Sequence, residues 1–202
     1  MSRLWAAGEG PFALRNLPNT ISIGRIFLVP VLVVLLRSPS RTAAALAAGT
    51  FFLASWSDFF DGYLARRHGL TSTLGKLLDP LADKLIVTAA LIMLTAMPRQ
   101  PRIASWVVVL IIGRELAVTG LRTLALSEGI VLAAEELGKY KTILQMLALQ
   151  GLLLHYTWFG VDFFSAGMYF LWPSLVLSLW SGIDYHVRII RRVMAPGTTH
   201  TA

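Results

Sequence analysis

The chain has 202 residues, of which 55% are hydrophobic and only 14% are charged, whereas soluble domains carry about 25% charged residues. A mean hydropathy of +0.65 and several apolar runs of nearly membrane-spanning length exclude an ordinary soluble domain and indicate an integral membrane protein. The net charge of +7 does not indicate a nucleic-acid partner, because the basic residues lie at predicted membrane edges and loops. Without cysteine, the chain has neither disulfides nor thiolate metal sites.

The apolar runs predict an all-α integral membrane protein with six transmembrane helices. Residues 1–17 are expected to lie along the membrane surface as a short amphipathic piece or to form a disordered tail. Residues 18–192 are predicted to form one domain, followed by a polar tail at 193–202. The predicted spans are 18–36, 42–66, 73–97, 103–126, 138–158 and 165–190.

The distribution of lysine and arginine predicts an orientation for these spans. Ten basic residues fall on the side of both termini and four on the other side, and the stretch 150–187 has none. Since basic residues mark cytoplasmic loops, we expect both termini and the active site to be cytoplasmic. The prediction is a multi-pass protein of a cell membrane, namely the bacterial inner membrane.

One polar stretch, from Asp58 to Lys84, separates the second predicted span from the third. Asp58 and Asp61 are three residues apart, and Asp79 and Asp83 are four apart. On helices, each spacing places both carboxylates on one face. Carboxylates at membrane depth persist mainly where they face a cavity, and four oxygen donors suit Mg²⁺ or Mn²⁺. The stretch therefore predicts a divalent-metal site in a cytoplasmic-side cavity.

The residues around these carboxylates suggest a phosphate ligand. Gly62 and Gly75 let a ligand approach the backbone, Ala65 keeps the next turn small, and Arg66 is a fork-shaped donor for phosphate. A metal pair would polarise the phosphorus, and a carboxylate not fully occupied by metal could accept a proton from an attacking alcohol. The pattern predicts chemistry on a metal-bridged phosphate or pyrophosphate.

Two other interpretations of the stretch remain open at this point. The first is a set of salt bridges between helices, made by Asp58, Asp61, Arg66 and Lys84. The second is a divalent-cation transporter, which would require carboxylates near the middle of the spans and a continuous polar path to the far face. The four carboxylates lie near one end of their spans, and the far halves of the helices are apolar.

The stretch matches every fixed position of the pattern D-x2-D-G-x2-A-R-x8-G-x3-D-x3-D, and so resembles the CDP-alcohol phosphotransferase family. The matching residues are Asp58, Asp61, Gly62, Ala65, Arg66, Gly75, Asp79 and Asp83. The resemblance implies six transmembrane helices, a homodimer and two divalent cations. It also implies transfer of a substituted phosphate from a CDP-linked lipid to an alcohol, with release of CMP.

The resemblance also assigns a role to each matching position. By position, it implies that Asp58, Asp61 and Asp79 are metal ligands. Asp83 would be the general base and would also touch one metal. The CDP moiety would be lined by Gly62, Ala65, Arg66 and Gly75.

Four stretches, one of them overlapping the pattern, resemble the group of this family that joins CDP-diacylglycerol to sn-glycerol 3-phosphate, giving phosphatidylglycerophosphate. They are residues 16–25, 75–84, 112–115 with Arg122, and 138–145. Other acceptors remain open: inositol 1-phosphate, which also carries a phosphate, and phosphatidylglycerol, as in a cardiolipin synthase.

An acceptor with its own phosphate requires positive charge beyond the metals. Arg114 and Arg122 are about two turns apart and can face one pocket. Lys139 and Lys141 are too close in sequence to share a helix face well, and we favour Lys139. The alternative is that these residues snorkel to the membrane surface, or that Arg114 pairs with Glu115 or another acid.

Several further residues receive weaker predictions. Ser22 and Arg25 would either contact a substrate or anchor their helix. His155, Tyr156 and Trp158 are predicted to form part of an interfacial belt on the far face. Asp184 is a candidate for an ion pair with an arginine.

Overall fold

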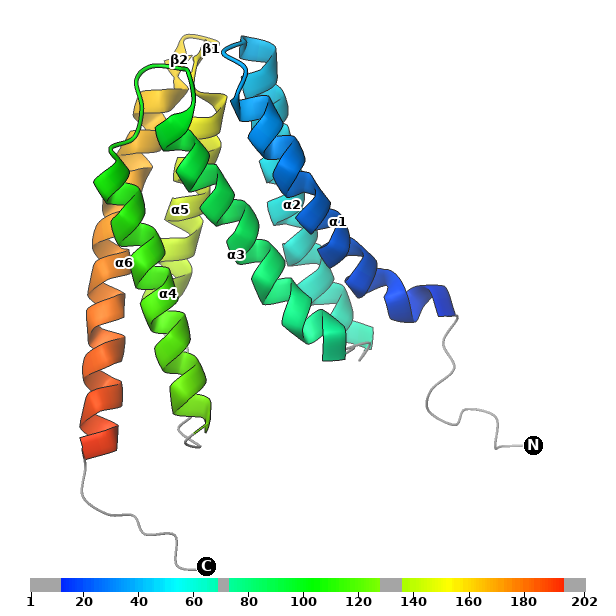
Figure 1. The fold of residues 1–202 in the computed structure, drawn as a ribbon, viewed down its shortest axis with the longest axis vertical. Helices are drawn as coiled ribbons and strands as arrows, with labels where there is room; N and C mark the ends of the chain where they lie inside the picture. Colours follow the sequence, from blue (N-terminus) through cyan, green and yellow to red (C-terminus); the bar gives the residue numbers. More distant parts are fainter. Residues whose placement is uncertain (1–11, 69–72, 128–135, 195–202) are drawn as a thin grey trace, which may run out of the picture. The chain divides into compact units, whose positions relative to one another are not determined.

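The computed structural model describes the backbone of residues 12–68, 73–127 and 136–194, and the side chains of residues 23–57, 81–127 and 138–192. These parts contain six helices and one small hairpin (Figure 1), which confirms the predicted all-α class. The helices are α1 (Phe12–Leu36), α2 (Arg41–His68), α3 (Thr73–Ala96), α4 (Ser105–Ser127), α5 (Glu136–Leu154) and α6 (Phe163–Met194). The hairpin pairs β1 (Thr157–Trp158) with β2 (Val161–Asp162) in antiparallel register.

The chain forms two compact units, residues 1–102 with α1 to α3 and residues 103–202 with α4 to α6 and the hairpin. Helix α1 begins at Phe12, six residues before the predicted start of the first span. Residues 1–11 and 195–202 lie outside the described part. The division into a segment at 1–17, one domain at 18–192 and a tail at 193–202 stays a prediction.

Among the described residues, α6 is the helix long and apolar enough to cross a bilayer, over Phe163–Arg192. Ile23–Leu36 in α1 is a shorter apolar helix. The side chains of residues 58–80, in α2 and α3, lie outside the described part. A protein with six spans therefore stays a prediction.

In the first unit, α1 packs against both α2 and α3. Helix α2 begins after Ser40, whose hydroxyl caps it by accepting a hydrogen bond from the amide of Ala43 at 3.1 Å. Small residues then recur at helical spacing on its buried face, at Ala44, Ala47, Ala48 and Ala54. Side chains of this size permit close helix approach.

In the second unit, α6 packs against both α4 and α5. The approach of α5 to α6 is close enough to require glycine at two positions. A Cβ added to Gly167 would lie 2.7 Å from the backbone nitrogen of Leu152, and one added to Gly151 would lie 2.9 Å from the Cα of Gly167. Backbone therefore meets backbone where these two helices touch.

Helix α5 ends at Leu154, four residues before the predicted end of the fifth span. His155 leaves the helix in a left-handed conformation, with φ of 61°. Phe159 and Gly160 also have positive φ, of 51° and 80°. Two successive residues of this kind form the tight turn that joins two short antiparallel strands, and β1 stands where the sequence predicted the last residues of the fifth span.

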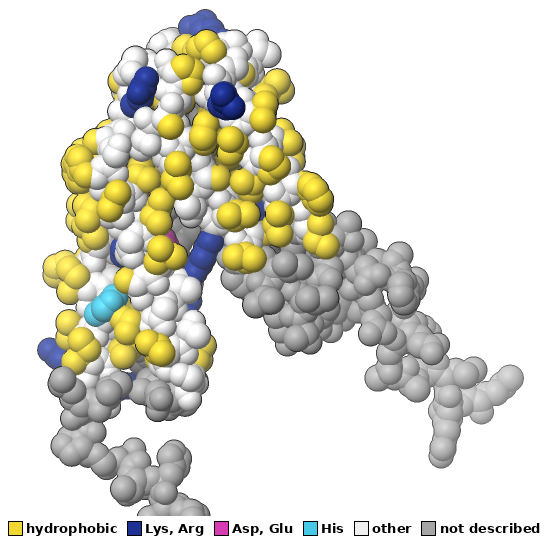
Figure 2. Space-filling model, in the orientation of Figure 1, with side chains coloured by type: hydrophobic (Ala, Val, Ile, Leu, Met, Phe, Trp, Pro, Cys, Tyr) yellow, Lys and Arg dark blue, Asp and Glu magenta, His cyan; other side chains and the backbone are white. Residues whose placement is uncertain are grey.

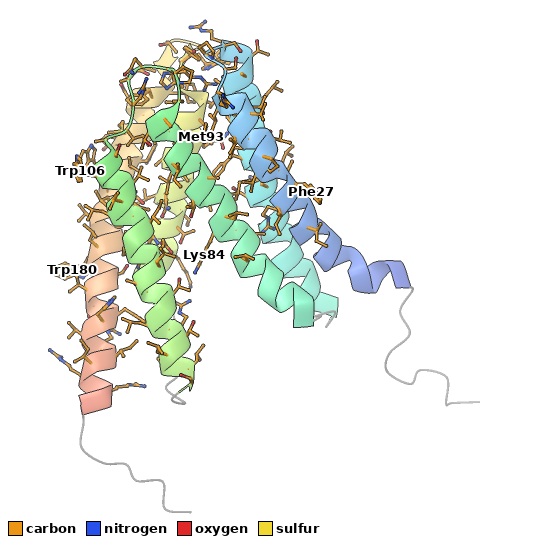
Figure 3. All side chains as sticks on the ribbon, in the orientation of Figure 1. Phe27, Lys84, Met93, Trp106 and Trp180 are labelled. Carbon is orange, nitrogen blue, oxygen red and sulfur yellow. The ribbon has the colours of Figure 1, made fainter. Side chains whose placement is uncertain are left out.

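Large apolar side chains are exposed along the helices of both units, and Figure 2 shows such side chains over much of the visible face. Phe27 on α1 is 69% exposed and Trp180 on α6 is 68% exposed. Both point away from their helices, as does Trp106 on α4 (Figure 3). Exposed apolar surface on this scale is typical of a protein that contacts membrane or a partner.

Candidate functional site

The four carboxylates of the pattern lie on two consecutive helices of the first unit. Asp58 and Asp61 belong to α2, and Asp79 and Asp83 belong to α3. The two helices are in contact, and only residues 69–72 separate the end of α2 from the start of α3. The helical spacing assumed from the sequence is therefore confirmed for the backbone of both pairs.

Helical backbone also aligns the other positions of the pattern. On α2, Asp58, Asp61 and Ala65 recur at intervals of three and four, and Gly62 lies beside them. On α3, Gly75, Asp79 and Asp83 recur at intervals of four. Each set therefore occupies one stripe along its helix.

The side chains of most of these positions lie outside the described residues. They are Asp58, Asp61, Gly62, Ala65, Arg66, Gly75 and Asp79. The described side chains contain no group of three or more carboxylates or histidines that could hold a metal. Asp83 is described and half-buried on α3, followed by half-buried Lys84, which Figure 3 labels. The chemistry of the full donor set, four carboxylates on two adjoining helices, fits hard divalent cations.

In the second unit, Arg114 on α4 is held against α6. Its Nε donates a hydrogen bond to the carbonyl oxygen of Ser178 at 2.8 Å, and its Nη2 donates to the hydroxyl of Ser181 at 2.6 Å. The side chain passes over Gly182, where an added Cβ would lie 3.1 Å from the Cγ of Arg114. Its Nη1 lies 3.2 Å from Oε1 of Glu115, the pairing that the sequence kept open as an alternative.

The two candidate lysines occupy different environments. Lys141 on α5 is buried, with 5% exposure, and its Nζ contacts Oε1 of Glu115. Lys139 is exposed. The structure thus places Lys141, and not the favoured Lys139, beside Arg114 and Glu115. Sequence spacing could not give this result, because Glu115 precedes Lys141 by 26 residues.

The second predicted arginine, Arg122, lies on the same face of α4 as Arg114. It is exposed, and its guanidinium carbon is 5.8 Å from the centre of the Tyr185 ring on α6. This distance is suited to a cation–π contact. The prediction that the two arginines share one helix face is confirmed, and that face meets α6.

The weaker predictions have mixed outcomes. Asp184 pairs with Arg188 at 2.7 Å, as expected for an ion pair. Arg25 is buried in α1 with 2% exposure, and the side chain of Ser22 lies outside the described residues. His155 is 4% exposed and its ring packs edge-on against the rings of Tyr156 and Phe164, and the interfacial belt stays a prediction.

Sequence reasoning missed the polar contacts that join α5 to α4 and α6 in the second unit. Glu115 contacts both Arg114 and Lys141, and the hydroxyl of buried Ser174 donates to the backbone carbonyl of Lys141 at 3.4 Å. The available signal was three serines in one apolar helix, Ser174, Ser178 and Ser181, spaced at four and three residues.

Comparison with known proteins agrees with the pattern on α2 and α3. The family model for CDP-alcohol phosphatidyltransferase matches residues 15–180. A Bacillus subtilis protein named CDP-diacylglycerol–glycerol-3-phosphate 3-phosphatidyltransferase is 41% identical over 84% of this chain and 93% of its own length. A Rickettsia typhi protein of the same name is 38% identical over 85% of this chain and 96% of its own length.

A relative with another name is also similar over most of the chain. The CMP-forming cardiolipin synthase of Oryza sativa subsp. japonica is 34% identical over 90% of this chain and 59% of its own length. The match over residues 15–180 and the identity to full-length relatives show that this chain belongs to the CDP-alcohol phosphatidyltransferase family.

Proposed function

We propose that this protein transfers the phosphatidyl group of CDP-diacylglycerol to sn-glycerol 3-phosphate, giving phosphatidylglycerophosphate and CMP. The observation that carries the proposal is the 41% identity, over nearly the whole of both chains, to a relative named for this reaction. The complete pattern of eight positions on α2 and α3 supports the reaction type. A cation transporter does not account for membership in a transferase family.

The proposal assigns Asp58, Asp61 and Asp79 to two divalent cations, Mg²⁺ or Mn²⁺, with Asp83 touching one of them. When bound, the cations would supply electrostatic stabilisation of the pyrophosphate and of the charge that develops on the CMP leaving group. Gly62 and Gly75 leave the backbone of α2 and α3 open to the CDP moiety, Ala65 occupies little space, and Arg66 supplies a fork of donors for phosphate.

Asp83 acts as the general base in this proposal. Its carboxylate accepts the proton of the 1-hydroxyl of glycerol 3-phosphate as that oxygen attacks the phosphorus that carries diacylglycerol. The new bond joins the glycerol oxygen to this phosphorus, and the bond from the phosphorus to the bridging oxygen breaks, so that CMP leaves with the bonding electrons. No covalent intermediate on the chain is required, because the acceptor itself attacks.

The phosphate of the acceptor is assigned to Arg114, Arg122 and Lys139. Support for Arg114 comes from its fixed guanidinium, which α6 holds through Ser178 and Ser181. Support for Arg122 comes from its position on the same face of α4 as Arg114. Support for Lys139 comes from its exposed position at the start of α5.

We further propose that the protein is a homodimer that crosses the membrane several times, with its active site and both termini in the cytoplasm. The exposed apolar side chains on every described helix support contact with lipid. The acyl chains of CDP-diacylglycerol would then stay in the bilayer while its head group reaches the carboxylates.

The test is an assay of the purified full chain in detergent with CDP-diacylglycerol and Mg²⁺ or Mn²⁺. Glycerol 3-phosphate, inositol 1-phosphate and phosphatidylglycerol are offered separately, and both CMP and the lipid product are measured. We expect turnover with glycerol 3-phosphate. Turnover with only inositol 1-phosphate or only phosphatidylglycerol would contradict the acceptor assignment. If none of the three acceptors supports CMP release, the proposed transfer is contradicted.

A further inference from the structure

Two cations of the second unit, buried Lys141 and half-buried Arg114, converge on one carboxylate oxygen. Nη1 of Arg114 and Nζ of Lys141 both contact Oε1 of Glu115. The side chains of Arg114 and Lys141 are 13% and 7% exposed, and that of Glu115 is 30% exposed. In this cluster of Arg114, Glu115 and Lys141, the Glu115 carboxylate is therefore the group most exposed to solvent. It can move away from the two cations.

Arg114 does not depend on Glu115 for its position. Its Nε and Nη2 are bound to Ser178 and Ser181 of α6, and its stem lies over Gly182. Only the Nη1 contact is made to the carboxylate. If Glu115 turns toward solvent, the guanidinium keeps its place and its Nη1 edge becomes available to another anion.

Lys141 is also held by its surroundings. Its side chain is buried, and its backbone carbonyl accepts a hydrogen bond from Ser174 of α6. The cluster carries two positive charges and one negative charge. A phosphate monoester, with more charge and more acceptor oxygens than a carboxylate, complements such a pair of cations better.

A further donor lies in the same interior. The hydroxyl of Ser178 is buried and has no hydrogen-bond partner among the described residues, while its carbonyl accepts from Arg114. Buried hydroxyls are normally paired. A ligand with several acceptor oxygens would give this hydroxyl a partner.

We infer that the Glu115 carboxylate occupies the binding position of the acceptor's phosphate. When the acceptor binds, its phosphate displaces this carboxylate from Arg114 and Lys141. Glu115 is then a positioning residue: it keeps the two cations ready for phosphate and competes with phosphate for them. The inference rests on the proposed function, because it takes the acceptor to be a phosphate monoester. It adds Lys141 to the residues that contact that phosphate.

The test is Glu115→Gln in the purified full chain. Three constants are measured: KM for glycerol 3-phosphate, the inhibition constant of inorganic phosphate competing with it, and KM for CDP-diacylglycerol. Removing the competing charge should lower KM for glycerol 3-phosphate and the inhibition constant of phosphate together by about tenfold, the factor for one charge-assisted hydrogen bond. KM for CDP-diacylglycerol should be unchanged. The matched control is Asp184→Asn, which removes a carboxylate from the ion pair with Arg188 and should change none of the three.

A purely structural ion pair would give a different result. Glu115→Gln would then lower the melting temperature, with KM for glycerol 3-phosphate and the inhibition constant of phosphate unchanged or raised, and this outcome overturns the inference. If the Glu115→Gln variant does not fold, Glu115→Asp is used instead, because it keeps the charge on a shorter side chain. KM for glycerol 3-phosphate and the inhibition constant of phosphate should then both fall by about threefold. If these two constants are unchanged, the inference is again overturned. Failure of the wild-type chain to use glycerol 3-phosphate contradicts the proposed function instead.

Discussion

Arg99 donates two hydrogen bonds to the carbonyl oxygen of Ser38, from Nε at 3.1 Å and from Nη2 at 2.8 Å. Its Nη2 also lies 3.4 Å from the carbonyl oxygen of Leu35, in the last turn of α1. Carbonyl groups at the end of a helix lack partners within the helix and carry partial negative charge. This buried guanidinium, 3% exposed, thus binds the segment after α3 to the turn between α1 and α2.

Replacement of Arg99 by alanine should destabilise the protein by about 2–4 kcal/mol, because it removes two charge-assisted hydrogen bonds to the part-buried carbonyl group of Ser38. The measurement is the melting temperature in detergent. Arg102→Ala, at an exposed position three residues further on, is the matched control and should have little effect. If both variants lower the melting temperature equally, the contact of Arg99 with Ser38 is not what stabilises this end of the unit.

Asp83→Asn should lower kcat by about 10²–10⁴-fold, the range for loss of a general base, while CDP-diacylglycerol still binds. The experiment measures CMP release and, separately, binding of the nucleotide lipid. Asp184→Asn, which makes the same substitution in α6 outside the pattern, should keep wild-type activity. Turnover retained by Asp83→Asn would exclude this residue as the base.

Removal of divalent cations should abolish CMP release, because the proposed leaving group depends on them for charge neutralisation. Treatment with a chelator followed by addition of Mg²⁺, Mn²⁺ or Ca²⁺ measures the requirement. We expect Mg²⁺ or Mn²⁺ to restore activity, and Asp58→Ala to raise the concentration of Mg²⁺ needed by about tenfold or more. Full activity in the presence of chelator would contradict the assignment of the carboxylates to metal.

Most helix bounds could be predicted from the apolar runs, since α2 and α3 begin and end within two residues of the predicted spans. The end of α5 could not, because it depends on His155 adopting a positive φ, which its side chain disfavours. The carboxylate pairs were predictable because their spacing is local.

The partners of the cations were not predictable in the same way. Lys141 and Lys139 differ little in sequence context, and their environments differ because Glu115 on another helix contacts one of them. The contact of Arg99 with Ser38 spans 61 residues. Contacts of this kind depend on how helices pack, and no periodicity along a single helix records them.

Gly167→Ala should destabilise the second unit by about 1–3 kcal/mol, because the added methyl group would overlap the backbone of α5. The melting temperature in detergent measures the effect. The matched control is Gly120→Ala in α4, where nothing lies within 4 Å of an added Cβ. That change should be neutral or stabilising by up to about 1 kcal/mol, because alanine favours helix over glycine. A similar effect of both changes would contradict the role given to the close contact.

The start of α6 should show a pH-dependent contribution from Asp162. Its Oδ2 accepts a hydrogen bond from the Ser165 hydroxyl at 2.5 Å, and its Oδ1 accepts one from the amide of Phe164 at 3.0 Å. The Ser165 hydroxyl and then the backbone amides hold the pKa of this exposed carboxyl below its ordinary value of 3.8. A carboxyl whose pKa is lowered in the folded state stabilises that state at pH values above its ordinary pKa. This contribution is lost as the pH falls through the pKa of the folded state.

Asp162→Ala should therefore melt at a lower temperature than the wild type near neutral pH, and the difference should shrink as the pH falls below about 4. Melting temperatures of both proteins between about pH 7 and pH 3 provide the measurement. Asp162→Asn, which still caps a helix, should lie between them at neutral pH and show little change with pH. A constant difference between wild type and Asp162→Ala would mean that the charge on Asp162 does not contribute.

The close contact of α5 with α6 at Gly151 and Gly167 also bears on how the chain would be inserted during synthesis. Helix α5 carries Lys139 and Lys141 near its start and Gln145 and Gln150 further along, which makes it a poor candidate to partition into lipid by itself. The hairpin of β1 and β2 and the glycine contact bring it against α6, which among the described residues is the helix long and apolar enough to cross a bilayer. The two helices are therefore expected to enter the bilayer as one preassembled pair, with the polar residues of α5 shielded before they meet lipid.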